Sequence, residues 1–501
     1  MKVVTPKRMH NIERAAFDDG ASENEFMQEA GSGVALVVQE FVERYGIARS
    51  VAVLAGKGNN AGDGYVAAIH LLHLDYTVVV FQYPSLATCS DMTQRNAARF
   101  AAEGGKILEI SDASEINFPE EGVILDAIFG TGFDRKVEEP FLSIINAANE
   151  SGLMVISIDI PSGLNGATGE AFPKSIQATE TAFLGLPKTG FFLREGWDNV
   201  GTLRYVDFGL PEEYIEEVEA DYILLTPQIV IPMLPKIRRT RHKYEAGLCV
   251  GLAGSPGMPG AALLSSSAAL KAGAGMVKLL HPGSMQQELG STPLELVKVS
   301  YEYSEPEPIL ELLNKASASF IGPGIGRSEE AKKLLKYVLE NIHRPCVIDA
   351  DALTIIAEEG FNIPSGAILT PHKGELEKLL RRDIPKGVTH EFLASCQAWV
   401  EEQQITLVLK GAPTFIFHPG ELIHISGMGD PGMATAGTGD VLTGLIAGLL
   451  AQHSLPHDAA RLGVYLHGLA GEHAAQEKTS YCMVAEDLLD YFPAAFAFEA
   501  S

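Results

Sequence analysis

The sequence predicts two successive α/β domains, and three observations carry this prediction. Short runs rich in β-branched residues recur between helix-like stretches in the first two hundred residues, as expected of parallel strands with helices on both faces of the sheet. Between 212 and 245 this alternation breaks up, because an acidic stretch, three prolines and a basic cluster follow one another. A second alternating series then continues toward the C-terminus. A chain of 501 residues is long enough for two or more domain cores.

Six apolar runs predict the strands of a parallel sheet in the N-terminal domain, and five more predict the strands of the second domain. The first series comprises 50–55, 77–81, 123–128, 154–160, 182–186 and 203–208. The second comprises 248–253, 318–321, 346–349, 367–369 and 406–409. We therefore expect an N-terminal domain at 1–212, a linker at 213–236 and a C-terminal domain at 237–501.

The charge balance limits the partners that this chain can bind. Acidic residues outnumber basic ones by 64 to 38, which gives a formal net charge of -26 and a field that repels nucleic acid and anionic membranes. A nucleotide site in such a chain needs local donors, such as backbone amides, a lysine or a metal ion.

The cysteines and the first residues indicate a cellular compartment. Five scattered cysteines without a CxxC pair do not suggest a disulfide framework. The first 14 residues lack the apolar core of a signal peptide, and no run of about 18 apolar residues occurs. We expect a cytoplasmic protein that does not span a membrane.

A glycine-rich segment at 56–64 follows the first predicted strand and precedes a helical pattern at 65–73. Its glycines and asparagines tolerate positive φ, so successive N–H groups can point into one concavity at the start of the helix. The spacing is neither GxGxxG nor that of a P-loop. We predict an anion cradle here, with a plain strand-to-helix turn as the alternative.

Two aspartates, Asp126 and Asp159, interrupt strongly apolar runs at the ends of predicted strands. Because ligands bind at the carboxyl edge of open parallel sheets, we expect both side chains at one site. A carboxylate in such surroundings needs a cation or a substrate donor as its partner. The alternative is that each aspartate only caps the turn that follows it.

Four motifs in this half together resemble the N-terminal epimerase domain of the bifunctional NAD(P)H-hydrate repair enzymes, over about residues 1–211. They are GxGNNxGDG at 56–64, DAIFGTG at 126–132, DIPSG at 159–163 and FLGLPKTG at 183–190. The resemblance implies a Rossmann-like three-layer fold, a potassium ion held by Asn60, Asp126 and Ser162, and an acid/base role for Asp159. The implied contacts to the hydrated dinucleotide are Asn59, Asn60, Ala61, Gly62, Asp63, Gly130, Thr131, Gly132 and Asp159.

The implied epimerisation needs little catalytic machinery. The substrate carries a hydroxyl on the ring carbon next to nitrogen, so the nitrogen lone pair can assist its departure, and one positioned carboxylate could suffice. Ala61 stands where the family usually has glycine, a small change that leaves Gly62 and Gly64 free to turn.

The turn Gly437-Thr438-Gly439-Asp440 precedes apolar residues with helical spacing and therefore opens a buried helix. A phosphate can bind the free N–H groups at such a helix start, where the helix dipole favours an anion. Asp440 is placed to act as a general base toward a hydroxyl that attacks this phosphate. The alternative is a helix-terminal charge that only complements the dipole.

Further glycine-rich or polar loops follow predicted strands of the second domain, at 253–261, 322–326, 370–375 and 410–414. With the GTGD turn they describe one ligand edge, which resembles the ribokinase-like fold and, more narrowly, the ADP- or ATP-dependent NAD(P)H-hydrate dehydratase domain over about residues 237–501. The resemblance implies that the hydrated dinucleotide binds Ala262, Gly326, His372 and Asp440. It also implies that the adenine nucleotide binds Lys410, Gly411, Ala412, Pro413, Thr414 and Gly439.

The resemblance also implies how water is removed. Hydroxide is a poor leaving group, whereas a phosphorylated hydroxyl departs as phosphate and restores the dihydronicotinamide ring. Asp440 would deprotonate the hydroxyl, and the amides of 436–439 would stabilise the transferring phosphoryl group. We expect Mg²⁺ to assist.

The fused order of the two domains resembles the bacterial arrangement, so we expect ADP rather than ATP as the phosphoryl donor, giving AMP and phosphate. The substrates would be NADHX and NADPHX.

Several alternatives stay open at this point. GTGD alone also fits a ribokinase-like vitamin or sugar kinase with a non-catalytic N-terminal binding domain. His372 could be an ordinary loop histidine, and Asp349 and Asp351 could be strand-end caps or part of the phosphate and metal region. Asp430 stands where the family commonly has asparagine. Relatives with this arrangement are usually homo-oligomers, so we expect one here.

Overall fold

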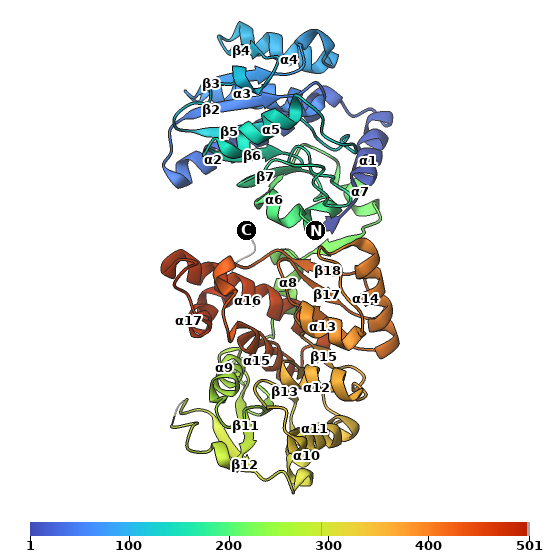
Figure 1. Ribbon diagram of the computed structural model, residues 1–501, viewed down its shortest axis with the longest axis vertical. Helices are drawn as coiled ribbons and strands as arrows, with labels where there is room; N and C mark the ends of the chain where they lie inside the picture. Colours follow the sequence, from blue (N-terminus) through green and yellow to red (C-terminus); the bar gives the residue numbers. More distant parts are fainter. Residues whose placement is uncertain (292, 498–501) are drawn as a thin grey trace. The chain divides into compact units, whose positions relative to one another are not determined.

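The computed structural model describes residues 1–291 and 293–497 and divides the chain into two compact units (Figure 1). The N-terminal unit comprises Lys2–Tyr222 and the short segment 386–390, and the C-terminal unit comprises Met1, 223–385 and the chain from Glu391 onward. The division falls inside the stretch 213–236 for which we predicted a linker. There the strand β9 (Tyr222–Leu224) pairs with a strand of the C-terminal unit.

A parallel sheet forms the centre of the N-terminal unit. Its strand order is β4-β3-β2-β5-β6-β7-β8, and every neighbouring pair is parallel, as the α/β prediction requires. All six predicted strands are confirmed, and β4 at the edge is additional. The strands of this unit are β1 (Lys2–Val3), β2 (Ser50–Ala55), β3 (Thr77–Gln82), β4 (Lys106–Glu109), β5 (Val123–Ala127), β6 (Met154–Ile158), β7 (Glu180–Leu184) and β8 (Thr202–Val206).

Helices cover both faces of this sheet, and each face has its own apolar core. Val51 and Val53 of β2 point into a core that contains residues of α2 and α3, whereas Ala52 and Leu54 point into a core that contains residues of α5. Strands that are apolar on both faces are typical of such parallel sheets. The helices are α1 (Pro6–Asp18), α2 (Glu23–Tyr45), α3 (Asn59–His73), α4 (Asp91–Ala102), α5 (Phe141–Glu150), α6 (Gly196–Val200) and α7 (Glu212–Glu217).

The glycine-rich segment after β2 differs from the prediction. Helix α3 begins at Asn59, six residues before the predicted start, so most of the segment is the first turns of a helix. None of its four glycines has a positive φ. Glycine is needed there for close packing instead, because a Cβ on Gly62 would lie 2.6 Å from Met27 of α2, and one on Gly64 would lie 2.6 Å from Ala127 of β5. The expectation of positive φ in this segment was therefore wrong, whereas the predicted helix start after β2 is present, at Asn59.

The sheet of the C-terminal unit is mixed. Counted from β9, its strand order is β9-β18-β17-β16-β15-β14-β13-β10-β11-β12. The strands β10 to β16 form a parallel series, whereas β16, β17 and β18 pair antiparallel. The five predicted strands of this domain are confirmed within this series. The strands are β10 (Leu248–Leu252), β11 (Met276–Pro282), β12 (Val297–Tyr301), β13 (Ala318–Ile321), β14 (Cys346–Ile348), β15 (Ile368–Leu369), β16 (Thr406–Leu409), β17 (Thr414–Phe417) and β18 (His424–Ser426).

The most buried helix of this unit is the one that follows the GTGD turn. Side chains from Val441 to Ala451 are buried, and a Cβ on Gly444 would lie 2.0 Å from the Ser265 carbonyl oxygen of α9, so the two helices touch through their backbones. The helices are α8 (Pro227–Val230), α9 (Pro259–Lys271), α10 (Pro306–Lys315), α11 (Glu329–Asn341), α12 (Asp351–Glu359), α13 (Lys373–Leu380), α14 (His390–Gln403), α15 (Thr438–Ala451), α16 (Pro456–Lys478) and α17 (Ala485–Phe496).

No helix within residues 1–291 and 293–497 has both the length and the apolar character to cross a bilayer.

Candidate active sites

Asp126, at the carboxyl end of β5, is fully buried and accepts hydrogen bonds from neutral donors. These are the backbone N–H groups of Ile128 (3.2 Å) and Ser162 (2.8 Å) and the hydroxyls of Ser157 (2.9 Å) and Ser162 (2.6 Å). Burial raises the pKa of Asp126, and the hydrogen bonds oppose this shift. A nearby cation would favour the ionised carboxylate further.

The three positions predicted to hold a cation lie together around one backbone group. Asn60 Nδ2 donates to the Phe129 carbonyl oxygen at 2.8 Å, and the Phe129 N–H donates to Ser162 Oγ at 2.9 Å, beside Asp126. The group offers amide, carboxylate, hydroxyl and carbonyl oxygens. Hard cations prefer oxygen ligands of this kind, so the residues fit a potassium ion.

Asp159 follows β6 directly and has a left-handed backbone with φ 63°. Such a conformation is uncommon for a residue with a Cβ and is concentrated at functional sites. Lys188, which is 0% exposed, forms an ion pair with the Asp159 carboxylate and donates to the Leu184 carbonyl oxygen at 2.9 Å. The pair places one ammonium and one carboxylate at the carboxyl edge of the sheet.

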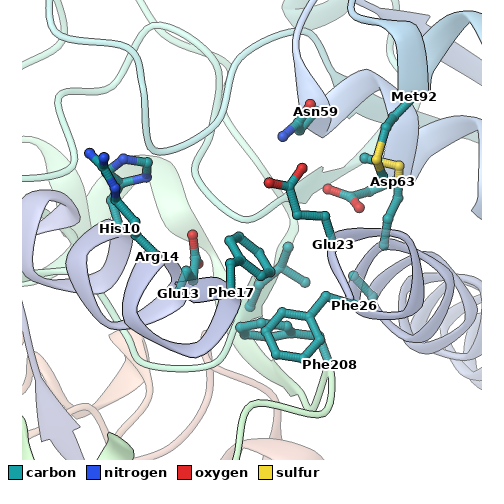
Figure 2. Close-up of a pocket in the computed structure, with 13 residues that line it drawn as sticks. His10, Glu13, Arg14, Phe17, Glu23, Phe26, Asn59, Asp63, Met92 and Phe208 are labelled. Carbon is teal, nitrogen blue, oxygen red and sulfur yellow. The ribbon is translucent and has the colours of Figure 1, made fainter. Parts of the chain in front are cut away.

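A pocket of about 390 Å³ opens between α1, α2 and the start of α3 (Figure 2). Its apolar wall includes Phe17, Phe26 and Phe208. The ring centroids of Phe17 and Phe26 lie 5.3 Å apart, and those of Phe26 and Phe208 lie 5.1 Å apart. The polar lining residues are His10, Glu13, Arg14, Glu23, Asn59 and Asp63.

Two of the predicted contact residues, Asn59 and Asp63, line this pocket. Ala61 is fully buried in α3, and Gly62 packs against Met27, so protein already covers that side of the helix. The predicted residues at 130–132 lie in the loop after β5, where a Cβ on Gly130 would come within 3.2 Å of Asn60.

The sequence reasoning missed Glu13 and Lys188 as site residues. Lys188 belongs to the motif FLGLPKTG, so the signal was present but no role was attached to it. Glu13 belongs to no motif, and only the packing of α1 brings it to the pocket.

The GTGD turn lies at the N-terminus of α15, as predicted. Gly437 is the N-cap residue with φ 96°, a conformation that favours glycine. His467 Nε2 donates to the Thr438 carbonyl oxygen at 2.9 Å, and burial lowers the pKa of His467 to about 4. The turn is therefore fixed by a neutral histidine, while N–H groups of the first helical turn lack helical partners and can bind an anion.

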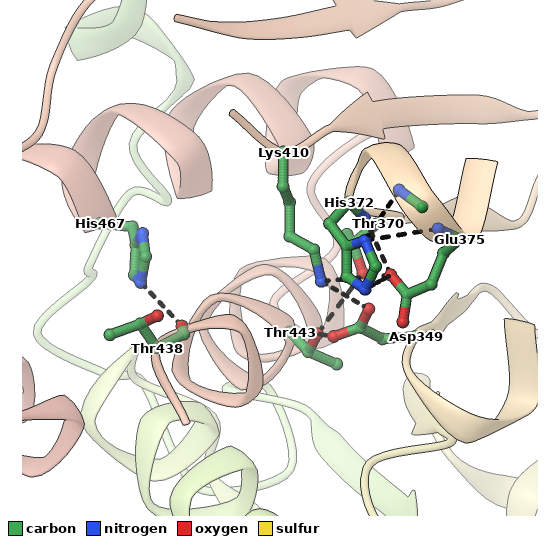
Figure 3. A network of polar contacts seen from close by, with 9 residues as sticks. Asp349, Thr370, His372, Glu375, Lys410, Thr438, Thr443 and His467 are labelled. Atoms are coloured by element: carbon green, nitrogen blue, oxygen red, sulfur yellow. Dashed lines mark hydrogen bonds and ion pairs between the residues drawn. The ribbon is translucent and has the colours of Figure 1, made fainter. Parts of the chain in front are cut away.

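A polar network of Lys410, Asp349 and Thr443 lies beside this turn (Figure 3). Lys410 Nζ donates to Asp349 Oδ1 at 2.8 Å, and Thr443 Oγ1 donates to Asp349 Oδ2 at 2.6 Å. A Cβ on Gly439 would lie 3.2 Å from Lys410 Nζ, so the lysine borders the helix start. Asp349 is thus an ion-pair partner that orients Lys410.

Asp440 lies in the first turn of α15, close to this network. Burial, followed by the negative charge of Asp349, raises the pKa of Asp440 to about 7, and Lys410 opposes the shift. A carboxyl group with a pKa near neutrality can accept a proton efficiently under ordinary conditions. The arrangement places this titratable carboxyl group near the ammonium of Lys410 and at a helix N-terminus.

His372 is the N-cap residue of α13. Its Nδ1 accepts from the N–H groups of Gly374 (3.0 Å) and Glu375 (3.3 Å), while Glu375 accepts from the His372 N–H at 2.8 Å. The ring therefore has a capping role, its Nε2 lies 3.6 Å from Glu375 Oε2, and the side chain is 61% exposed.

The other predicted residues of this unit occupy different surroundings. Gly326 has φ 74° and donates to Asp351 Oδ2 at 3.0 Å, so Asp351 fixes that loop. Ala262 is fully buried in α9. Thr414 opens β17 and donates to the Gly411 carbonyl oxygen at 2.9 Å, which closes the loop 410–414.

One cluster outside both edges has side chains that could bind a metal. Ligand atoms of His418, Glu421 and His457 lie within 4.8 Å of one another. Arg461 forms an ion pair with the same Glu421, so a guanidinium already supplies positive charge there.

Two protein families match this chain, one in each half. The family described as NAD(P)H-hydrate dehydratase matches residues 249–494, and the family described as YjeF-related protein N-terminus matches residues 23–190. The chain is 35% identical to the bifunctional NAD(P)H-hydrate repair enzyme Nnr of Moorella thermoacetica, over 98% of this chain and 96% of that one.

Two solved structures resemble the C-terminal unit. A hypothetical protein from Streptococcus mutans is 24% identical with a TM-score of 0.50, and the match covers 55% of this chain and 98% of that one. An ADP/ATP-dependent NAD(P)H-hydrate dehydratase from Bacillus subtilis, co-crystallised with ATP and Mg²⁺, is 28% identical with a TM-score of 0.48 and the same coverage.

Proposed function

Because the chain belongs to the family of bifunctional NAD(P)H-hydrate repair enzymes, we propose how its two units divide the two reactions. The chain repairs hydrated nicotinamide dinucleotides and has an epimerase and a dehydratase activity. The N-terminal unit interconverts the R and S forms of NADHX and NADPHX, and the C-terminal unit returns the S form to NADH or NADPH. A vitamin or sugar kinase is the less favoured reading.

The proposed dehydratase site is the edge formed by Asp440, Lys410 and the start of α15. The observation that carries it is a carboxyl group with a raised pKa beside a partly buried ammonium and a helix N-terminus. Asp440 takes the proton of the ring hydroxyl as that oxygen attacks the terminal phosphoryl group of the nucleotide. Lys410 and the amides at the start of α15 offset the charge that the phosphoryl oxygens carry.

Loss of phosphate then completes the reaction. The ring nitrogen lone pair expels the phosphate with the carbon–oxygen electron pair, and a proton leaves the neighbouring ring carbon, which restores the dihydronicotinamide. With ADP as donor, the products are NAD(P)H, AMP and phosphate. Mg²⁺ bound to the nucleotide would neutralise phosphate charge.

The proposed nucleotide contacts are Lys410 to Thr414 and Gly439. The proposed contacts to the hydrated dinucleotide are Ala262, Gly326, His372 and Asp440.

The proposed epimerase site is the carboxyl edge around Asp126 and Asp159. Asp159, paired with Lys188, is the acid/base group, and Asn60, Asp126 and Ser162 hold potassium. The potassium ion would stabilise the buried charge of Asp126. Asn59 to Asp63, Gly130 to Gly132 and Asp159 are the proposed substrate contacts.

The cell location and assembly are also proposals. Cys89, Cys249, Cys346 and Cys396 are buried free thiols and Cys482 is an exposed free thiol, which suits a reducing cytoplasm. We expect a homo-oligomer, and light scattering coupled to size-exclusion chromatography measures its mass directly.

The dehydratase proposal is tested by the absorbance of regenerated NADH, with ADP and ATP compared in the presence of Mg²⁺. Asp440→Asn is expected to lower kcat by about 100-fold or more, because a general base contributes that much. Glu486→Gln is the matched control, since Glu486 lies exposed in the first turn of α17. If both variants keep the wild-type rate, the role of Asp440 is refuted.

A further inference from the structure

We propose that the pocket between α1, α2 and the start of α3 receives the hydrated nicotinamide ring, and that Glu13 supplies the proton with which the ring hydroxyl departs. This inference rests on the proposed epimerase function and adds a second carboxyl group to Asp159. It gives Glu13, a residue outside every sequence motif, a direct role at the reacting atoms.

The shape and lining of the pocket suit a flat, partly polar ring. Its volume of about 390 Å³ lies within the range of about 300 to 1,000 Å³ that is usual for small-molecule sites. Phe17, Phe26 and Phe208 supply an aromatic wall, and Glu13 and Asp63 present carboxyl groups from two different helices (Figure 2). A ring that stacks on the aromatic wall therefore has carboxyl groups within the same pocket.

The charges around the pocket require that a proton be stored there. Three carboxyl groups, those of Glu13, Asp63 and Asp159, interact electrostatically with one another, and the nearby ammonium of Lys188 is already paired with Asp159. If all three ionised, three negative charges would repel one another in largely buried surroundings, which is strongly unfavourable. At least one of the carboxyl groups therefore keeps its proton near neutral pH.

Glu13 is the group that can both hold and release this proton. Burial, followed by the charge of Asp159, raises the pKa of Glu13 to about 7, and Lys188 opposes the shift. Burial, followed by the charges of Asp159 and Glu13, raises the pKa of Asp63 well above its ordinary value. The charged and titratable groups that face Glu13 are His10, Arg14, Glu23, Asp63, Asp159 and Lys188.

The chemical step balances with these two groups. The carbon–oxygen bond breaks with its electron pair on oxygen, the oxygen takes the proton of Glu13 and leaves as water, and the nitrogen lone pair forms a carbon–nitrogen double bond. A water molecule then adds to the opposite face of that carbon, Asp159 takes its proton, and the nitrogen regains its lone pair. One proton has moved from Glu13 to Asp159, and exchange with solvent restores both groups.

The first experiment measures kcat/KM for R-to-S conversion of NADHX against pH in the full-length wild-type protein. Because Glu13 must be protonated, the rate is expected to fall about tenfold per pH unit above pH 7. Glu13→Gln is expected to lower the rate by about 100-fold or more and to remove this alkaline decline. Asp18→Asn, which changes an exposed carboxylate on the same helix, is the matched control. It should keep both the wild-type rate and the alkaline decline.

A second measurement uses water enriched in oxygen-18. Each epimerisation is expected to place a solvent oxygen on the ring carbon, and product that keeps its original oxygen would overturn the step. The near-UV circular dichroism and the thermal unfolding curve of Glu13→Gln, compared with those of the wild-type protein, report whether the N-terminal unit of the variant has folded. If the variant is unfolded, the wild-type pH profile decides, because a profile without an alkaline decline near pH 7 overturns the inference.

The outcomes separate this inference from the proposed function. Wild-type protein that fails to epimerise NADHX refutes the proposed function of the N-terminal unit. Wild-type protein that epimerises while Glu13→Gln retains the same rate and the same alkaline decline refutes only the role of Glu13.

Discussion

Asp440→Asn is expected to stabilise the C-terminal unit at neutral and alkaline pH while it removes the dehydratase activity. An acidic residue in the first turn of a helix normally stabilises it by about 0.3 to 1 kcal/mol, so the ordinary expectation is a loss of stability. Here the pKa of Asp440 is raised from 3.8 to about 7, because burial and Asp349 disfavour its ionised form. The ionised carboxylate therefore costs the folded state free energy.

The sign and size of this effect depend on pH. The carboxyl group ionises above about pH 4 in the unfolded chain and only above about pH 7 in the folded chain. Stability is therefore lost progressively between these values as pH rises, and the loss is complete above pH 7. At about 1.36 kcal/mol per pKa unit the cost reaches at most about 4 kcal/mol, which partial exposure to solvent reduces. Asparagine, which is neutral throughout, avoids this cost.

Differential scanning calorimetry between pH 4.5 and 8.5 measures the effect. The Tm of Asp440→Asn should exceed that of wild type by several degrees at pH 8, since about 1 kcal/mol shifts Tm by roughly 2 to 4 °C at this size. The difference should shrink toward pH 4.5. The Tm of Glu486→Gln should not rise relative to that of wild type as the pH increases. A Tm of Asp440→Asn at or below wild type at pH 8 would refute the reasoning.

Three further changes test other parts of the structure. Lys188→Met should abolish epimerisation and lower the free energy of unfolding by about 3 to 5 kcal/mol, measured by denaturant titration, because it leaves the buried Asp159 carboxylate unpaired. Exchange of potassium for lithium should slow epimerisation by the wild-type protein. An epimerisation rate that does not change would argue against a bound potassium ion. In Asp126→Asn the epimerisation rate should be low in both salts. Gly444→Ala should cost about 1 to 3 kcal/mol of stability, because the new Cβ would lie 2.0 Å from the Ser265 carbonyl oxygen, and thermal unfolding measures this loss.

The parts of the fold that the sequence predicts well are those with local signals. The run 50–55 coincides with β2, and the GTGD turn opens α15 with its N-cap at Gly437, because β-branched composition and glycine punctuation act over a few residues. The start of α3 was placed too late for the same reason. From the local sequence alone, its glycines indicate a loop. In the structure, glycine is needed there because the helix packs closely against Met27 and Ala127.

The missed parts depend on groups that are distant in the chain. β17 and β18 are short, and they become strands by pairing with their neighbours in the sheet. Glu13 reaches the epimerase pocket only because α1 packs near the start of α3, 46 residues later in the sequence at Asn59. The roles of Asp349 and Lys410 likewise appear only when β14 and β16 bring the two side chains within 2.8 Å.

The left-handed backbone of Asp159 limits what evolution can place there. Aspartate, asparagine and glycine visit this region most readily, whereas a β-branched residue would be strained. Relatives that have lost epimerase chemistry should therefore drift first to asparagine or glycine at this position. A natural variant with valine there would signal that the local chain path itself has changed.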